Sequence, residues 1–187
     1  MIFFMNYAII LILIGVAADN LFLANLSANN HVSIPPWHWI MIIVSMLGGQ
    51  LAAVATGTYL GKMIFPHTDR YSQVLAVCML TSLTVKVGKE MLEMSHQKRY
   101  FISYKFENIL FLVLGASIFQ FVMGVAVTWL GINILPYIVF SGPVIYQFIM
   151  LGFFMGKSHL IRYVSQFRCF FAVLMLTGIG MLIFAIF

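Results

Sequence analysis

One carboxylate lies in the middle of an almost entirely apolar segment. The stretch LIGVAADNLF places Asp19 beside Asn20, among residues that are typical of a membrane-spanning helix. A carboxylate in hydrocarbon costs a few kcal/mol or more, and such residues usually face a bundle interior and mark an ion or proton path. Asp19 is therefore the first candidate for a functional residue.

Amide side chains in other apolar runs extend this candidate site. Carboxylate, amide carbonyl and water oxygens are the ligands that hard divalent cations such as Mn²⁺ prefer. We predict a cation pathway with Asp19 as the metal ligand, formed together with Asn20, Gln50, Gln120 and Lys86. Each glutamine can also simply bond to a neighbouring helix, which is a common role of polar side chains in membranes.

Lys86 leaves a second interpretation of Asp19 open. It lies in LTVKVGKE, about two turns before the end of a predicted helix. An intramembrane lysine usually faces the interior and pairs with an acid, or its long stem carries the ammonium to water at the helix end. If Lys86 pairs with Asp19, directly or through water, it occupies the place of a cation and Asp19 is structural.

The composition excludes an ordinary soluble domain. The 187 residues are 63% hydrophobic and 8% charged, whereas globular domains carry roughly 25% charged residues. The ten Lys and Arg residues form no continuous stripe, so we expect cytoplasmic loops rather than a nucleic-acid surface. Cys78 and Cys169 lack CxxC spacing, and we expect them to pack in the interior.

Six apolar runs are long enough to span a bilayer, which takes about 20 helical residues. We expect an all-α integral membrane protein with spans at residues 3–26, 37–61, 72–94, 107–130, 134–156 and 165–187, forming a single membrane domain over 1–187. Lys and Arg concentrate in the third and fifth connections, so the positive-inside rule puts those in the cytoplasm and both termini outside.

The chain also repeats itself. LILIG at 11–15 resembles FLVLG at 111–115, GTYLGK at 57–62 resembles GFFMGK at 152–157, and AVCMLT at 76–81 resembles AVLMLT at 172–177. These collinear matches, at offsets of 100, 95 and 96, indicate two three-helix repeats at 1–94 and 107–187, joined by a loop at 95–106. Because three is odd, the repeats are inverted, as in many secondary transporters whose site lies at the midplane.

Several of these segments resemble a known family. GVAADNLFLANLS, GGQLAAVATGTYLGKMI, GKEMLEM, GASIFQFVMGVAV and LTGIGMLI are similar to successive helices of the bacterial MntP-like manganese efflux pumps, within the LysE-type exporters. The resemblance implies an inner-membrane exporter whose acidic path falls on Asp19, Gln50 and Phe119. Only Asp19 is acidic here, and the offset of 100 independently pairs it with Phe119. The chain is thus a divergent member with a depleted acidic site.

We therefore predict efflux of Mn²⁺ or a related divalent cation by alternating access, with the cation as substrate and no resident cofactor. The alternative is a non-transporting MntP-like membrane subunit or scaffold in which Asp19 is structural. The expected partners are the lipid bilayer and the cation, and a homo-oligomer or a membrane partner subunit stays open. We expect no enzyme, because the five histidines lie in loops or at helix ends and no nucleophile–base pair is recognisable.

Overall fold

The computed structural model describes residues 2–28, 36–93, 106–157 and 161–186, and every regular element in these ranges is an α-helix. The helices are α1 (Ile2–Ala28), α2 (Pro36–Ile64), α3 (Arg70–Glu93), α4 (Phe106–Trp129), α5 (Ile134–Lys157) and α6 (Ile161–Ile186). Their bounds lie within a few residues of the predicted runs. The prediction of an all-helical chain with six long helices is confirmed for the described residues.

Local sequence signals set the two described turns. Ser72, in the first turn of α3, stabilises the start of this helix, since its hydroxyl donates to the carbonyl of Asp69 at 2.7 Å and accepts from the Asp69 amide at 3.1 Å. Gly131 ends α4 with a φ of 71°, and the amide of Ile132 reaches back to the carbonyl of Val127 at 3.2 Å. Glycine suits this left-handed helix stop because it has no Cβ to clash.

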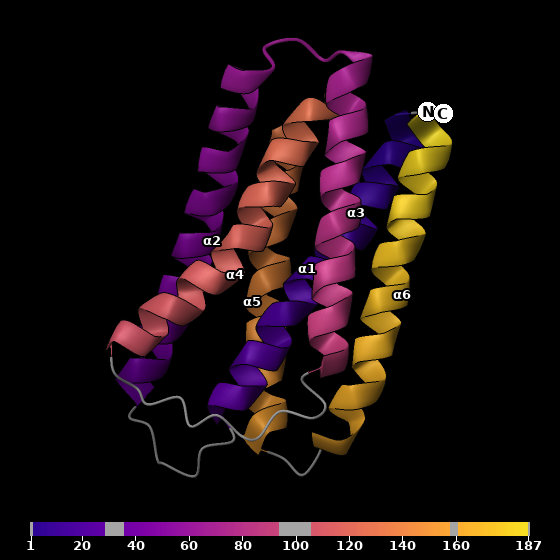
Figure 1. Cartoon of the computed structure of the whole chain (residues 1–187). Coiled ribbons are helices and arrows are strands. Elements are labelled where there is room, and N and C mark those ends of the chain that lie inside the picture. Colours follow the sequence, from indigo (N-terminus) through magenta and orange to yellow (C-terminus); the bar gives the residue numbers. More distant parts are fainter. Residues whose placement is uncertain (1, 29–35, 94–105, 158–160, 187) are drawn as a thin grey trace.

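Both of these turns lie at one end of the bundle. In Figure 1 the α2–α3 turn and the α4–α5 turn lie at the same end as the start of α1 and the end of α6. We call this the termini end. Each successive helix therefore runs opposite to the one before it, so the chain traverses the bundle six times.

The closest helix pairs join the two halves of the chain. α2 packs mainly against α4, and α5 packs mainly against α1, while α6 also lies along α1. Glycines allow this approach: a Cβ on Gly57 would collide with the Phe121 backbone, 3.1 Å from its carbonyl carbon. A Cβ on Gly152 would collide with the Leu21 backbone in the same way, 3.0 Å from its carbonyl carbon. Small residues at such positions are what bring membrane helices into close contact.

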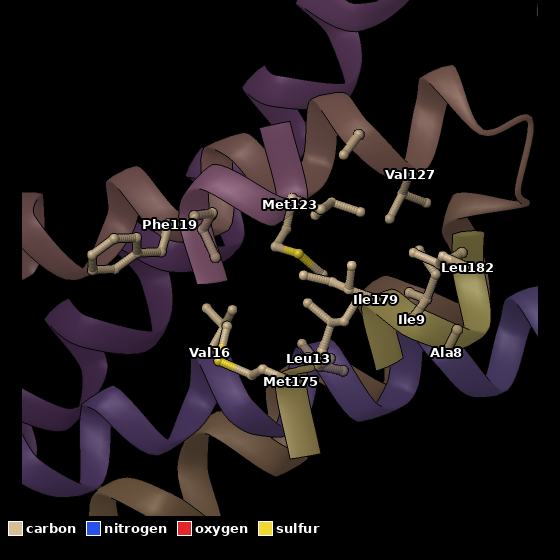
Figure 2. Close-up of a cluster of buried hydrophobic side chains, with 14 of the residues drawn as sticks. Ala8, Ile9, Leu13, Val16, Phe119, Met123, Val127, Met175, Ile179 and Leu182 are labelled. Carbon is tan, nitrogen blue, oxygen red and sulfur yellow. The ribbon is translucent and has the colours of Figure 1, made fainter. Parts of the chain in front are cut away.

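The interior is apolar and so is most of the outer surface. Figure 2 shows side chains of α1, α4 and α6, among them Leu13, Met123 and Ile179, gathered in one buried cluster with Phe119 at its edge. Large apolar side chains such as Trp37, Phe154 and Phe184 are exposed, as expected for a surface that contacts lipid. The expected burial of Cys78 is wrong: it lies on an exposed face of α3, while the side chain of Cys169 lies outside the described residues.

Three of the described stretches are long and apolar enough to cross a membrane, namely Ile40–Ile64, Arg70–Lys89 and Leu135–Met155. The described apolar stretches of α1, α4 and α6 are shorter: Met5–Leu21, Val113–Trp129 and Phe170–Ile186. Spanning of the membrane by all six helices, and the inverted repeat, stay predictions.

Candidate cation site

Asp19 lies in the interior of the bundle. Its side chain is 7% exposed and that of Asn20 is 2% exposed, and the neighbouring Ala17 and Ala18 are fully buried. α5 and α6 both pack against α1, and the low exposure of the Asp19 side chain shows that protein encloses the carboxylate. A buried carboxylate persists only where it is hydrogen-bonded, paired or bound to a cation.

Asn20 and Gln50 form a reciprocal amide pair that joins α1 to α2. Asn20 Nδ2 donates to Gln50 Oε1 at 3.2 Å, and Gln50 Nε2 donates to Asn20 Oδ1. Asn20 Nδ2 also donates to the carbonyl of Ala17 at 3.2 Å. Each amide oxygen accepts one bond in this pair and keeps one lone pair for another partner. Asn20 and Gln50 are thus in direct contact, and the buried Asp19 is the neighbour of Asn20 in the chain. A cation pathway through these residues stays a prediction.

Gln120 is engaged elsewhere. Its Oε1 accepts a hydrogen bond of 3.1 Å from the hydroxyl of Tyr137 on α5. Both side chains are buried, and Gln120 Nε2 has no hydrogen-bond partner among the described residues. A buried unpaired donor costs about 1–3 kcal/mol. Gln120 therefore belongs to a second, neutral polar group, on a different helix contact from the Asn20–Gln50 pair.

The sequence reasoning missed Tyr137, although a signal was present. The buried face of α5 repeats every four residues through Tyr137, Ser141, Ile145 and Ile149, which is helical spacing. Two polar residues at the start of that face could have been read as interior groups. Ser117 on α4 was also missed: its hydroxyl is buried without a partner among the described residues and faces Gly49, the neighbour of Gln50.

Lys86 approaches α4 rather than a helix end. Its Nζ lies 5.2 Å from the centre of the Phe119 ring, within the range of a cation–π interaction. Phe119 is buried, whereas the Lys86 side chain is largely exposed. The offset of 100 in the predicted repeat pairs Phe119 with Asp19, so the ammonium contacts the residue that this prediction makes the counterpart of the carboxylate.

The described part of the chain has no group of three or more His, Cys, Asp or Glu side chains that could hold a metal ion. A cation near Asp19 would therefore be bound by one carboxylate, amide and hydroxyl oxygens, backbone carbonyls and its own water. This donor set is chemically suited to a hard ion. With one negative charge, it replaces little of the hydration of a divalent ion.

Buried polar groups between long apolar helices are typical of polytopic membrane transporters, in which such residues line the path of the substrate. A family model described as "Mntp: Putative manganese efflux pump" matches residues 35–184 of this chain. The chain therefore belongs to the MntP family, and the resemblance found in the sequence is confirmed. The matched range begins just before α2 and ends within the last residues of α6, and it does not include α1, which carries Asp19. No curated protein and no solved structure matches the chain.

Proposed function

We propose that this protein exports Mn²⁺ or a related divalent cation by alternating access, with Asp19 as the anionic ligand of the ion. The observation that carries this proposal is the burial of Asp19 beside the Asn20–Gln50 pair in a chain of the MntP family. In this mechanism Asp19 supplies the charge, and the free lone pairs of Asn20 and Gln50 supply neutral oxygens.

The inverted repeat is part of the same proposal, and the glycine contacts support it. The Gly57–Phe121 contact becomes the Gly152–Leu21 contact when the offsets of 95 and 100 are applied. The buried positions of α2 also agree with those of α5 at the offset of 95: Ile42 with Tyr137, Met46 with Ser141, Gln50 with Ile145, Val54 with Ile149, Gly57 with Gly152 and Thr58 with Phe153. Equivalent packing of the two halves is what an inverted-repeat transporter requires.

The six helices in this proposal all span the bacterial inner membrane, with the termini end outside. Its support is the concentration of basic residues in the connections at the opposite end. Export then means that the cation reaches Asp19 from the end opposite the termini and leaves at the termini end.

One observation favours the alternative function, a non-transporting membrane subunit. The ammonium of Lys86 faces the Phe119 ring, at the place that the repeat pairs with Asp19. In this alternative, Lys86 acts as a tethered cation that balances the charge of Asp19, and the reciprocal amide pair is a helix–helix link rather than a set of ligands.

The test compares two carboxylate variants in a manganese-sensitive bacterial strain. If Asp19 is the ligand, Asp19→Asn abolishes Mn²⁺ efflux, measured as retained cell manganese and poor growth on high manganese, while the amount of protein in the membrane changes little. Asp69→Asn is the matched control, because Asp69 is exposed in the α2–α3 turn. It is expected to export normally.

The two functions also differ in a double variant. If Lys86 balances Asp19, Asp19→Asn leaves the intramembrane ammonium of Lys86 without its counter-charge, which is costly in lipid, so the protein level falls. Asp19→Asn with Lys86→Met then restores the level, because no lone charge remains. If the double variant recovers the protein level and no variant exports metal, the subunit function is supported. If Asp19→Asn exports metal normally, Asp19 is not the ligand.

A further inference from the structure

Two hydrogen-bond links connect the two closest helix pairs. The α1–α5 pair and the α2–α4 pair are each packed tightly through a glycine, and their mutual contacts are sparser. Asn20 on α1 bonds to Gln50 on α2, and Tyr137 on α5 bonds to Gln120 on α4. Both links therefore join one pair to the other. A change in the spacing of the pairs must break or stretch them.

A pocket of about 430 Å³ opens beside the second link. It lies at the termini end, between the start of α1, the α4–α5 turn and the first two turns of α5. Its wall includes Asn6 and Asn133, and Tyr137 closes it on the α5 side. Gln120 does not line the pocket, but its amide is hydrogen-bonded to the Tyr137 hydroxyl. The tyrosine thus stands between the pocket and a buried amide with an unpaired donor.

The α1 wall of the pocket continues toward the predicted site. Met5, Ile9 and Leu13 line the pocket at intervals of four residues, so they share one helix face. Ala17 is the next residue on that face, and Asn20 follows one turn later. At 1.5 Å per residue, Asn20 lies about 10 Å beyond Leu13 along the helix axis. The pocket and the Asn20–Gln50 pair are therefore consecutive parts of one face, and Asp19 is the neighbour of Asn20 in the chain.

The first two turns of α5 are followed by two residues that favour bending of the helix. Pro143 lies inside the helix and has no N–H, so it cannot bond to the carbonyl of Val139, and its ring disfavours a straight helix. Gly142 precedes it, and a Cβ there would meet no atom within 4 Å. Packing thus does not require glycine at this position. Proline and glycine are the usual sites of helix bending, and here they lie directly after the segment that carries Tyr137.

We propose that the segment 134–141 is a gate between the pocket and the Asp19 region, and that Tyr137 closes it by bonding to Gln120. In the closed state, which the structure describes, the Tyr137 ring separates the pocket from the buried amides. When the segment bends at Gly142–Pro143, the bond to Gln120 breaks and water enters from the pocket. Gln120 Nε2 and Oε1 then both gain water partners, which offsets the loss of the tyrosine bond.

The occupant of the open pocket is a hydrated cation. Its wall is mostly apolar, with Asn6 and Asn133 as polar side chains besides Tyr137. Such a wall has no charge to strip water from the ion, so it lets the ion pass without holding it. This inference rests on the export function proposed above, in which the gate is the exit toward the termini end.

The test measures access of solvent beyond the gate and does not depend on transport. In a Cys78→Ser, Cys169→Ser background, Ala17→Cys places a thiol at a fully buried position one turn beyond the pocket. The full chain in lipid nanodiscs is treated with a charged maleimide. Tyr137→Phe removes only the hydroxyl, and the free energy of one neutral hydrogen bond corresponds to about a 2- to 13-fold change in the open-to-closed ratio. Labelling of the thiol is expected to rise by that factor.

Two controls keep the result specific. Tyr146→Phe removes a hydroxyl from an exposed tyrosine of the same helix and is expected to leave labelling unchanged. A reporter at Ala126→Cys, fully buried on α4, is expected to stay unlabelled in every variant. Equal labelling of Ala17→Cys with and without the Tyr137 hydroxyl overturns the gate. Labelling of Ala126→Cys in Tyr137→Phe also overturns it, because the whole bundle then loosens.

A second variant tests the hinge. Gly142→Ala with Pro143→Ala restores the helix bond to Val139 without a steric clash, so labelling of Ala17→Cys in the Tyr137→Phe protein should fall back toward the parental rate. Gly115→Ala, also without a neighbour within 4 Å, is the matched control and is expected to have no effect. If Gly142→Ala with Pro143→Ala leaves the labelling unchanged, the hinge is refuted. If labelling of Ala17→Cys depends on the Tyr137 hydroxyl in a protein that exports no metal, the gate is supported and the export function is refuted.

Discussion

The glycine contacts between the halves make the most direct quantitative test of the proposed symmetry. In Gly57→Ala the added methyl group meets the backbone of Phe121, and in Gly152→Ala it meets the backbone of Leu21 and the Cβ of Ala24 at 2.7 Å. Backbone carbonyls cannot rotate away as a flexible side chain does. Because ordinary carbon contacts lie at about 3.5–4.0 Å, the helices must separate by roughly 1 Å.

The cost follows from the packing that this separation removes. Gaps of 0.5–1 Å already forfeit about a quarter to a half of each atomic contact, and overpacking a close interface costs about 1–3 kcal/mol. Both variants are expected to lose stability by similar amounts in this range. Gly48→Ala is the matched control on α2, since a Cβ there meets nothing within 4 Å. It is expected to be neutral or slightly stabilising, because alanine favours the helix.

The assay heats the purified protein in detergent and measures, at each temperature, the fraction of the protein that stays monodisperse. The reasoning is refuted if Gly57→Ala is as stable as Gly48→Ala. If Gly57→Ala lowers the stability strongly and Gly152→Ala does not, the α2–α4 contact is supported. The glycine contacts then no longer support the inverted repeat.

Two further contacts are tested by the same unfolding assay. Trp129 donates from Nε1 to the carbonyl of Gly61 at 3.0 Å, and that carbonyl also accepts from the Phe65 amide. Trp129→Phe is therefore expected to cost only about 0.5–1.5 kcal/mol, whereas Trp129→Ala, which empties a buried site, should cost about 3–5 kcal/mol; equal costs would contradict this account. Gln50→Leu leaves the Asn20 amide buried without its partner and should cost about 1–3 kcal/mol. Adding Asn20→Leu should recover part of that loss, and no recovery would show that the pair is not a coupled unit.

The six helices were predictable because apolar runs of this length have few alternatives. A helix satisfies all its backbone groups internally, which lipid demands, so length and hydropathy determine the element without knowledge of its neighbours. The ends were also readable: Gly131 with Asn133 marks the α4–α5 turn, and the amide of Leu135 bonds to Asn133 Oδ1 at 3.1 Å. The burial of Asp19 was predictable from the free-energy cost of placing its charge in lipid.

The partners of the polar side chains were not predictable, because they depend on which helices touch. Sequence reasoning grouped Gln120 with Asn20 and Gln50, yet Gln120 faces Tyr137, since α4 contacts α5 near the termini end. In one of the repeat matches, residue identity and burial disagree. The offset of 96 pairs the buried Leu80 with Leu176, which is 59% exposed, whereas an offset of 95 pairs it with the fully buried Met175. If the halves repeat as proposed, burial favours an offset of 95 between α3 and α6 over the offset of 96 that residue identity indicates.

The position of the polar links has a consequence for how an ion could cross. The helix pairs α1–α5 and α2–α4 are each held together by a glycine against a neighbouring backbone, so the proposed mechanism has each pair move as one body. Between them lie the Asn20–Gln50 and Tyr137–Gln120 links, which cost little to break because water can replace either bond. The offset of 100 relates Asn20 to Gln120, so each link holds the same position of a first helix to the opposite pair. Release of one link while the other holds would open the bundle at one end only, and this is the elementary requirement of alternating access. In the proposed mechanism, the packing of each second helix against the other half of the chain therefore places the hydrogen bonds, rather than the tight glycine contacts, on the interface that moves.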